Sequence, residues 1–209
     1  MKPSGFFAAF FAVFAILSLT GGTAAAEGKA LGPAAQFVQR LGETALMSLT
    51  EKNMQRPVRE RRVREILQNN FDIQQIGKFA MGAYWKDASE SQRLEYMDLF
   101  EDMIVQTYTT RFEEYSGQTL KVSGSTPSGN DFIVYSQVVQ KDGPPVSLEW
   151  RVRSKGGALR VVDVVVESVS MSVTQRSDFS AVIQRGGGKI ESLLSSLRAR
   201  KKSSDPEKI

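Results

Sequence analysis

The stretch "VVDVVVESVSMSVTQRSDF" (residues 161–179) decides the fold, because it changes from a strand pattern to a helix pattern without a linker. Five of its first six residues are valine, and β-branched residues favour strands. A strand with one face in water alternates apolar and polar residues, whereas this run is apolar on both faces except at Asp163. We therefore expect a central strand that is covered on both sides and is followed at once by a helix.

Three more strand-like segments precede the valine run. They are "TLKVSG", "DFIVYSQVVQK" and "PVSLEWRVRS", and the turn sequences "STPSGN", "DGPP" and "KGG" connect the four strands. Connections this short favour antiparallel pairing between strands that follow one another in the sequence. The sequence therefore predicts an antiparallel meander of four to five strands.

Helical patterns both precede and follow the predicted strands in the sequence. Upstream, one helix begins near Pro33, another opens at Pro57, and two more cover residues 72–83 and 90–115. Asp72 is a plausible cap for the third, and Ser89 with Gln92 forms a capping box for the fourth. Downstream, residues 172–185 and the segment around Leu193 and Leu197 are again helical, separated by three glycines. Helices, then sheet, then helices indicate an α+β protein.

The composition excludes several functions. The 209 residues include no cysteine and no histidine, which removes Ser-His and Cys-His nucleophile pairs, Cys/His zinc sites and disulfides. The formal net charge is +4 with 24% charged residues, and the aromatic residues follow apolar helix faces, so nothing indicates binding of nucleic acid. The basic group around Arg59, Arg61, Arg62 and Arg64 has two interpretations, a solvated helix face or a contact for an anionic partner.

The first 26 residues have the order of a secretory signal peptide. Lys2 is followed by the uncharged apolar run 6–19, and small residues at 24 and 26 fit a cleavage site before Glu27. We expect export to the periplasm, a single domain over residues 27–200, and a disordered charged tail over 201–209.

The order of these pieces resembles a known family. The stretches "IGKFAMGAYWKDASESQRLEYMDLFEDMIVQTYTTRFEEYSG", "VSLEWRVRS" and "VVDVVVESVSMSVTQRSDFSAVIQRGGGKIESLLSSL" are similar to the periplasmic component of the Mla phospholipid-transport pathway. This family of auxiliary ABC-transporter proteins is also called the toluene-tolerance family, and a similar branch is associated with hopanoids. The triple glycine at 186–188 and the charged tail depart from the family pattern.

The resemblance implies a fold, a cargo and partners. It implies a curved antiparallel sheet wrapped by helices, as in the nuclear-transport-factor-two (NTF2-like) fold, with an apolar cavity between sheet and helices. Members carry phospholipid as cargo, without a cofactor, a metal or a catalytic reaction. The implied partners are an inner-membrane ABC transporter complex with an MCE-domain protein and an outer-membrane lipoprotein complex, and the carrier itself is expected to be a monomer. A polycyclic hopanoid is the alternative cargo.

The lining of this cavity can be predicted by combining the valine run with the helices. Val162, Val164 and Val166 are expected to share a concave surface, under the helices at 72–83 and 90–115, with residues of the neighbouring strands: Trp150, Val152, Ile133 and Tyr135. The predicted lipid-binding residues are Ile76, Phe79, Ala80, Tyr84, Phe100, Met103, Ile104, Tyr108, Ile133, Tyr135, Trp150, Val152, Val162, Val164, Val166 and Met171.

The residues alone leave three questions open: whether the apolar surface encloses a cavity, what Asp163 does, and whether the protein is an enzyme. Apolar strands and helix stripes more often form a close-packed core than a ligand cavity. Asp163 is either a structural carboxylate bonded to backbone or to an arginine, or a contact near a lipid head group. An isomerase-type enzyme would need an acid or base in the pocket, and Asp163 with Tyr135 or Tyr108 is the candidate set.

Overall fold

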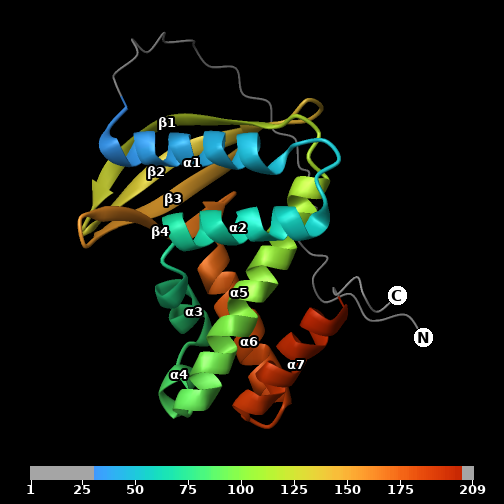
Figure 1. Ribbon diagram of the computed structural model, residues 1–209. Helices are drawn as coiled ribbons and strands as arrows, with labels where there is room; N and C mark the ends of the chain where they lie inside the picture. The colour runs from blue at the N-terminus through green and yellow to red at the C-terminus, as the bar shows by residue number, and fades with distance from the viewer. Residues whose placement is uncertain (1–30, 204–209) are drawn as a thin grey trace. The chain divides into compact units, whose positions relative to one another are not determined.

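The computed structural model describes residues 31–203 and confirms the α+β class (Figure 1). The predicted signal peptide lies outside the described residues. The helices and strands follow one another as α1 (Pro33–Leu49), α2 (Arg56–Asn70), α3 (Ile73–Met81), α4 (Tyr84–Asp87), α5 (Glu90–Glu113), β1 (Thr119–Ser128), β2 (Asp131–Val139), β3 (Val146–Lys155), β4 (Ala158–Val166), β5 (Val169–Ser170), α6 (Met171–Arg185) and α7 (Ile190–Ser203).

Three predicted boundaries need correction. β1 extends to Ser128, so most of the predicted turn "STPSGN" is strand. The helix predicted over residues 72–83 ends at Met81, because Gly82 adopts a φ of 62° that continues no helix, and the short α4 follows. The tail predicted as disordered from residue 201 is helical as far as Ser203, since α7 continues to that residue. Residues 204–209 of that tail lie outside the described part of the chain. Within residues 31–203, no helix combines the length and the apolar character needed to cross a bilayer.

The predicted meander is confirmed, with β1-β2-β3-β4-β5 as the strand order and every pairing antiparallel. The sheet is curved and does not close on itself. A β-bulge interrupts the pairing of β3 with β4, so that Val152 lies opposite Val161 while Arg151 lies opposite Asp163. Val162 is the extra residue of this bulge. The bulge breaks strict alternation in the valine run, so Val161 shares the face of Val164, three residues further along, which regular alternation would not allow.

The face of the sheet that α1 covers follows from the register. Trp150 lies directly opposite Val134 and Val164, and directly paired residues of antiparallel strands share one face. Ile133 and Tyr135 flank Val134 along β2, so they lie on the other face. The prediction that they share the face of Trp150 and Val152 is therefore wrong, because side chains alternate faces along β2 and Val134 takes the position opposite Trp150.

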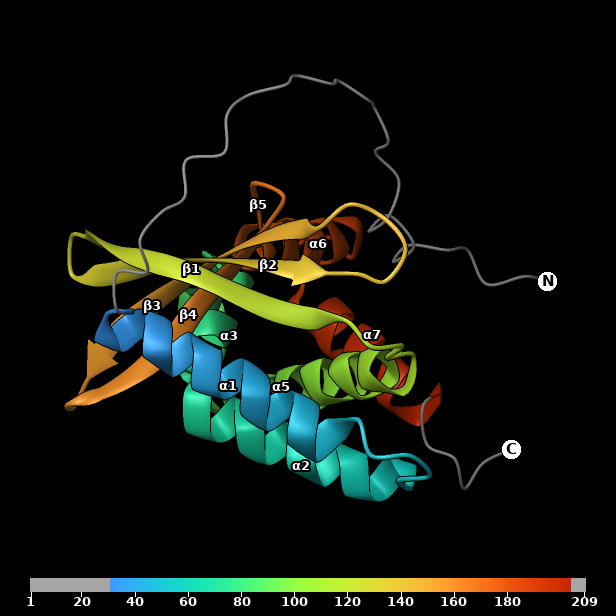
Figure 2. The ribbon, with the colours of Figure 1, turned by 90° about the horizontal axis from the view of Figure 1, so that it is seen from above.

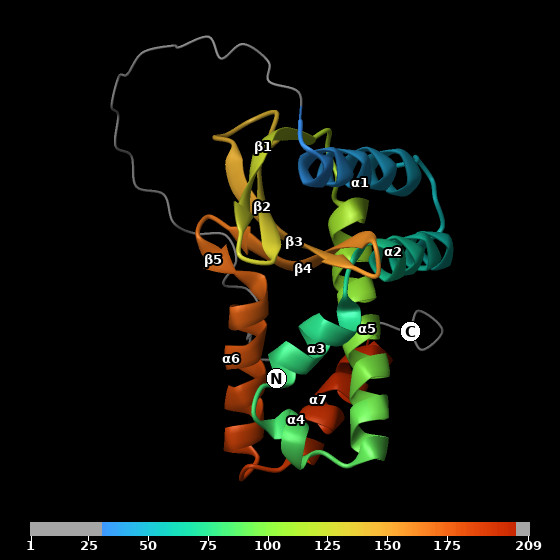
Figure 3. The ribbon, with the colours of Figure 1, turned by 90° about the vertical axis from the view of Figure 1, so that its left-hand side faces the viewer.

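The helices cover the sheet unequally. α1 packs along β1 and β2, while α3 and α6 approach β4, and α5 packs between α2 and α7 (Figures 1 and 2). Seen from the side, α1 lies on one side of the sheet, and α6 leaves β5 to run beside α3 (Figure 3). The described chain therefore contains one apolar cluster under α1 and another among the helices.

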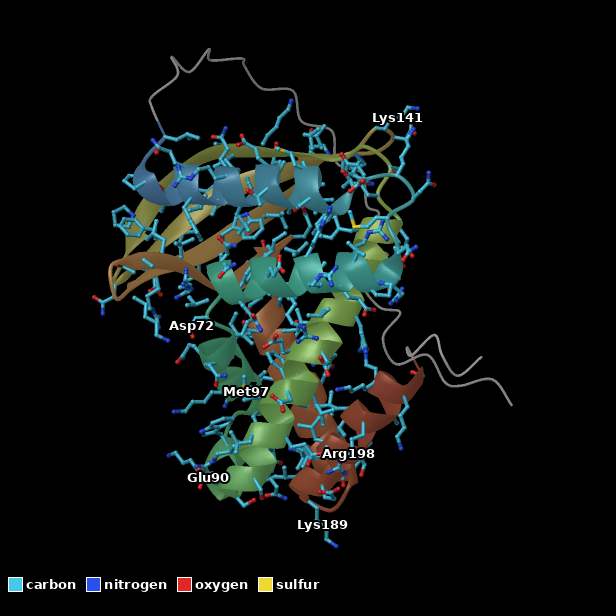
Figure 4. All side chains as sticks on the ribbon, in the orientation of Figure 1. Asp72, Glu90, Met97, Lys141, Lys189 and Arg198 are labelled. Atoms are coloured by element: carbon cyan, nitrogen blue, oxygen red, sulfur yellow. The ribbon has the colours of Figure 1, made fainter. Side chains whose placement is uncertain are left out.

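Short-range capping starts the helices where the sequence predicts. Ser89 Oγ accepts a hydrogen bond from Gln92 N at 3.2 Å, and Gln92 Oε1 accepts one from Ser89 N at 3.0 Å, which completes the capping box. Asp72 accepts from Gln75 N at 3.2 Å and also from Lys155 Nζ at 2.8 Å. Figure 4 shows Asp72 where α3 begins, next to the sheet. The start of α3 is thus tied to the β3–β4 hairpin.

Asp163 is a structural carboxylate. It accepts hydrogen bonds from Val164 N at 2.9 Å, from Ser172 N at 3.1 Å and from the hydroxyl of Ser170 at 2.7 Å. Ser170 in turn caps α6 by accepting from Val173 N at 3.1 Å. The acidic residue in the valine run therefore joins β4 to the first turn of α6. The helix does not follow the valine strand at once as predicted, because the turn at Glu167 and Ser168 and the two-residue strand β5 lie between them.

The basic face of α2 is used largely inside the fold. Arg59 is buried and donates to Leu49 O at 3.1 Å, and Arg62 donates to Ser48 O at 2.7 Å. Arg64 donates to Glu101 at 2.7 Å and to Asp102 at 2.6 Å across the interface with α5. These guanidinium groups hold the α1–α2 connection and the α2–α5 interface, which differs from both sequence-based interpretations.

Candidate functional site

The described chain has two apolar regions that differ in how fully they are filled. The first, the helical core, lies among α3, α5, α6 and α7. Its fully buried members include Ala80, Met81, Tyr96, Phe100, Phe179, Ile183 and Leu194. The second, the sheet compartment, lies between α1 and the sheet and comprises Leu46, Leu120, Val122, Trp150 and Val164, which all remain partly exposed.

The helical core is closed by aromatic contacts. The rings of Tyr96 and Phe100 stack with centroids 5.6 Å apart, and Phe179 meets both edge-on at 5.9 and 6.1 Å. Tyr96 Oη donates to Gly77 O at 2.8 Å, so the buried hydroxyl is satisfied, and burial raises the pKa of this phenol. The region is packed like an ordinary protein interior.

Several predicted lipid-binding residues belong to this packed region. Ala80, Phe100 and Met103 are buried in the helical core, and Ile76, Tyr84 and Ile104 pack against it while partly buried. The side chain of Phe79 points outward, with the guanidinium of Arg176 at 5.3 Å from its ring centroid. The expected cavity under α3 and α5 is absent at Ala80, Phe100 and Met103, because α6 and α7 fill that space.

The sheet face under α1 is filled at one end. Val134, Val152 and Val161 are 0% exposed and pack against Ala35 and Val38 of α1. The small residues of α1 allow this helix to lie close to the strands. Of the predicted lipid-binding residues, Val152 belongs to this filled end, and Val162 at the bulge is also buried.

The other end of the same face is open. A groove of about 380 Å³ runs between the C-terminal half of α1 and the edge strand β1. Leu46, Leu120 and Val122 supply its apolar wall, and Gln39, Glu43 and Lys121 stand at its polar rim. An apolar floor with a polar rim can accept a hydrocarbon chain while a polar group stays in water.

Gly42 fixes the height of α1 above the strand. A Cβ atom at this position would lie 2.6 Å from Cδ2 of Leu120, closer than atoms in contact can come. Glycine therefore lets α1 rest on β1 at this point, while Leu46, one turn further along, borders the groove. The groove exists because the helix touches the strand at one point and stands off beside it.

Tyr108 on α5 lies in surroundings of a different kind. Its side chain is 44% exposed, yet burial raises the pKa of its phenol, with Arg111 acting in the opposite direction. Of the remaining predicted residues, Val166 and Met171 are partly buried near the β4–α6 connection.

A second surface hollow is polar and has a structural explanation. Arg64, Gln68, Asp98, Glu101, Asp102 and Lys201 line it. Arg64 and Lys201 both bond Asp102, so the hollow is an ion-pair network between α2, α5 and α7. A similar link, Arg198 to Glu95 at 2.6 Å, joins α7 to α5 at the position labelled in Figure 4. No metal-binding group of three or more acidic residues occurs between residues 31 and 203.

Sequence reasoning missed the residues that form the groove itself. Gly42, Leu46, Leu120 and Val122 were not among the predicted lipid-binding residues. One signal was available, because a glycine within an otherwise regular helical pattern indicates close approach to another element. The position of Leu120 and Val122 on an edge strand under α1 required the three-dimensional register.

The fold and the groove define a class, α+β proteins in which helices cover a curved antiparallel sheet and leave an apolar opening beneath one of them. A family model described as "MlaC protein" matches residues 39–199. The chain belongs to this family.

Individual relatives are distant in sequence. The intermembrane phospholipid transport system binding protein MlaC of Haemophilus influenzae is 26% identical over 145 residues, which span 65% of this chain and 67% of that protein. A phospholipid-binding protein from Ralstonia solanacearum, solved in complex with a phospholipid, has a TM-score of 0.71. That match covers 83% of this chain and 99% of the other, at 22% identity, and establishes similarity of fold.

Proposed function

We propose that this protein is a periplasmic carrier that holds the acyl chains of a phospholipid in the sheet compartment and moves the lipid between membrane complexes. One observation carries the proposal. Apolar side chains on the α1-facing side of the sheet remain partly exposed next to a groove, in a chain of the MlaC family. The role is binding and transport, and it requires no chemical step.

The nature of the cargo is supported by the relatives. The Haemophilus protein is named for phospholipid transport, and the Ralstonia structure was determined with a phospholipid bound. We propose the same class of cargo here. The hopanoid alternative would bring a rigid polycycle, and identification of the extracted lipid distinguishes the two.

The energetics explain why a carrier needs such a compartment. Each methylene shielded from water contributes about 0.8 kcal/mol, so two chains of about 15 methylenes would cost roughly 25 kcal/mol to expose. An apolar groove accepts a chain from a bilayer with little net change, because both environments exclude water. The head group can remain at a polar rim, where Gln39, Glu43 and Lys121 stand.

The proposed lining differs from the sequence-based set. Leu46, Leu120 and Val122 form the entrance, and Trp150 and Val164 continue the apolar surface across the sheet. Tyr108, Val166 and Met171 stay in the proposal because they are partly exposed. At about 380 Å³ the groove is near the lower limit of typical ligand pockets, so loading of a whole diacyl lipid requires α1 to move away from β1.

The cellular setting is proposed from the sequence and the family. The signal peptide predicted in residues 1–26 would place the mature protein in the periplasm. We propose that it receives and delivers lipid at an inner-membrane ABC transporter complex with an MCE-domain protein and at an outer-membrane lipoprotein complex. A carrier without its own energy source moves lipid in the direction that these partners impose.

The test is lipid content after gentle purification from bacteria. We expect mass spectrometry to find co-purified phospholipid with the wild-type protein. Val122→Asp and Leu46→Asp place a charge in the groove from opposite walls, and both should reduce the bound lipid strongly, since a buried unpaired charge is costly. Leu94→Asp, at an exposed position of α5, is the matched control and should retain lipid.

Two outcomes would contradict the proposal. The first is a wild-type protein that carries no lipid under gentle extraction. The second is full retention of lipid by both groove variants, with circular dichroism showing that they are folded. Because Val122 and Leu46 belong to different elements, a folding failure of one variant leaves the other to decide.

A further inference from the structure

One strand beyond Val122 of the groove lies Ser136, which accepts a hydrogen bond from the indole of Trp150. We propose that the pair Trp150–Ser136 sets the length of acyl chain that the sheet compartment accepts. This inference rests on the proposed function, and it adds a determinant of cargo selection that lies on β2 and β3, away from the groove entrance.

The register places Ser136 directly behind the groove. Val122, which lines the groove on β1, is paired with Ser136 on β2. Paired residues of neighbouring antiparallel strands have Cβ atoms about 5 Å apart on the same face. A chain that passes over Val122 therefore meets the position of Ser136 next.

The indole of Trp150 lies over that position. Trp150 Nε1 donates to Ser136 Oγ at 2.8 Å, and Ser136 is only 3% exposed. Ser136 is paired with Leu148, so it is diagonal to Trp150, and the indole must reach along the sheet toward the groove to make this bond. A buried hydrogen bond of this kind holds a large ring in one orientation.

Beyond Trp150 the middle of this face is filled. Val134, which is paired with Trp150, and Val152 and Val161 in the next row are 0% exposed beneath α1, while Phe132, at the β2 position of that row, is 36% exposed. At the three valines a chain end has no space past the indole unless the indole moves. The tryptophan thus separates the open end of the α1-covered face from the filled end.

The consequence is a limit on chain length. If the indole ends the available space, each methylene beyond that limit stays unburied and contributes nothing to binding. Removal of the indole should restore about 0.8 kcal/mol per added methylene, which is roughly a fourfold increase in relative binding for each methylene. Chains shorter than the limit should be affected little.

The test uses delipidated protein and vesicles that contain equal amounts of phosphatidylethanolamine with short, medium and long saturated chains. The bound lipid is analysed by mass spectrometry. We expect Trp150→Ala to shift the bound population toward long chains by several-fold per added methylene. Ser136→Ala keeps the ring but removes its acceptor, so it should produce a smaller shift in the same direction. Val161→Ala removes volume from the filled end and should leave the chain-length distribution unchanged.

The outcomes separate this inference from the proposed function. If wild-type protein binds no lipid at all, the proposed function fails. If it binds lipid and the distribution is the same in Trp150→Ala, Ser136→Ala and wild type, the carrier function stands and the tryptophan does not limit chain length. If Trp150→Ala does not fold, Trp150→Phe replaces it, because phenylalanine is smaller and cannot bond Ser136, and it is held to the same expectation.

Discussion

The helical core and the sheet compartment are built from similar apolar residues but reach different degrees of closure. In the helical core, the rings of Tyr96, Phe100 and Phe179 from two helices pack against one another, and the three residues are at most 3% exposed. In the sheet compartment, α1 packs Ala35, Val38 and Leu41 against the strands at one end, and the groove opens from Gly42 onward. The covering helix, more than the sheet, decides where an opening remains.

The difference also suggests a division of labour. The closed aromatic cluster contributes most to the free energy of unfolding. The partly exposed apolar surface contributes less in the lipid-free protein, and a bound lipid that covers it would raise the stability of the fold. If this division is correct, substitutions in the helical core should change stability with little effect on lipid, and substitutions in the sheet compartment should do the reverse.

The largest expected effect compares Phe100→Ala with Trp150→Ala in lipid-free protein. Phe100→Ala leaves a cavity in the helical core and should lower the free energy of unfolding by about 3–5 kcal/mol. Trp150→Ala should cost clearly less, because the indole is already partly exposed. Denaturant unfolding measures both. Equal losses would mean that the sheet compartment is as tightly packed as the helical core.

Two glycine substitutions, one in each region, should have effects of intermediate size on stability and lipid content. A Cβ at Gly77 would lie 2.8 Å from Sδ of Met97 and 3.0 Å from Cδ1 of Phe100 in the helical core. The gain in helix propensity, about 1 kcal/mol, offsets part of this overpacking, so Gly77→Ala should destabilise by up to about 2 kcal/mol and leave lipid content unchanged. In Gly42→Ala the gain in helix propensity, about 1 kcal/mol, offsets much of the clash with Leu120. Its stability should change little, while the displaced Leu120 enters the groove and lowers lipid content. Loss of lipid from the Gly77 variant alone would reverse the assignment.

A smaller effect is expected for Tyr96→Phe. The substitution removes the hydrogen bond to Gly77 O but keeps the ring cluster, so unfolding should become easier by about 1 kcal/mol. Calorimetry or denaturant unfolding can detect this change. Lipid content should match the wild type, and a strong loss would indicate that the helical core takes part in binding.

The smallest effect concerns pH. Arg153 donates hydrogen bonds of 2.6 and 3.0 Å to the two carboxylate oxygens of Asp131, and these bonds lower the pKa of that carboxyl group. Partial burial acts in the opposite direction, and the positive charge of Arg151 lowers the pKa further. A lowered pKa in the folded state stabilises the protein above the ordinary value of 3.8, and this contribution is lost as the pH falls through the folded-state pKa. Asp131→Asn should therefore be less stable than wild type near neutral pH, with the difference shrinking in acid. A constant difference at all pH values would exclude this linkage.

Much of the fold could be predicted because it depends on local signals. The turn sequences between strands fixed the meander, and Ser89 with Gln92 fixed the start of α5. The structural interpretation of Asp163 was also correct, since a single acid in an apolar run needs donors nearby and the backbone at the start of α6 supplies them. These features involve residues close together in the sequence or adjacent in the sheet.

The candidate site was less predictable because it depends on how distant elements pack. The bulge at Val162 changed which valines share a face, and no residue in the run signals it. Phe100 and Trp150 both looked like cavity-lining residues, but whether each is covered depends on α6, α7 and α1. The periodicity of a sequence shows which side of an element is apolar and does not show whether another element fills the space beside it.

The most direct test of the central claim is a crystal structure of the protein with a phospholipid loaded from vesicles. The account predicts acyl-chain density between α1 and the strands β1 and β2, entering past Leu120 and Val122 and ending at Trp150. Acyl density among α3, α5, α6 and α7, in place of the packed rings around Phe100, would contradict it.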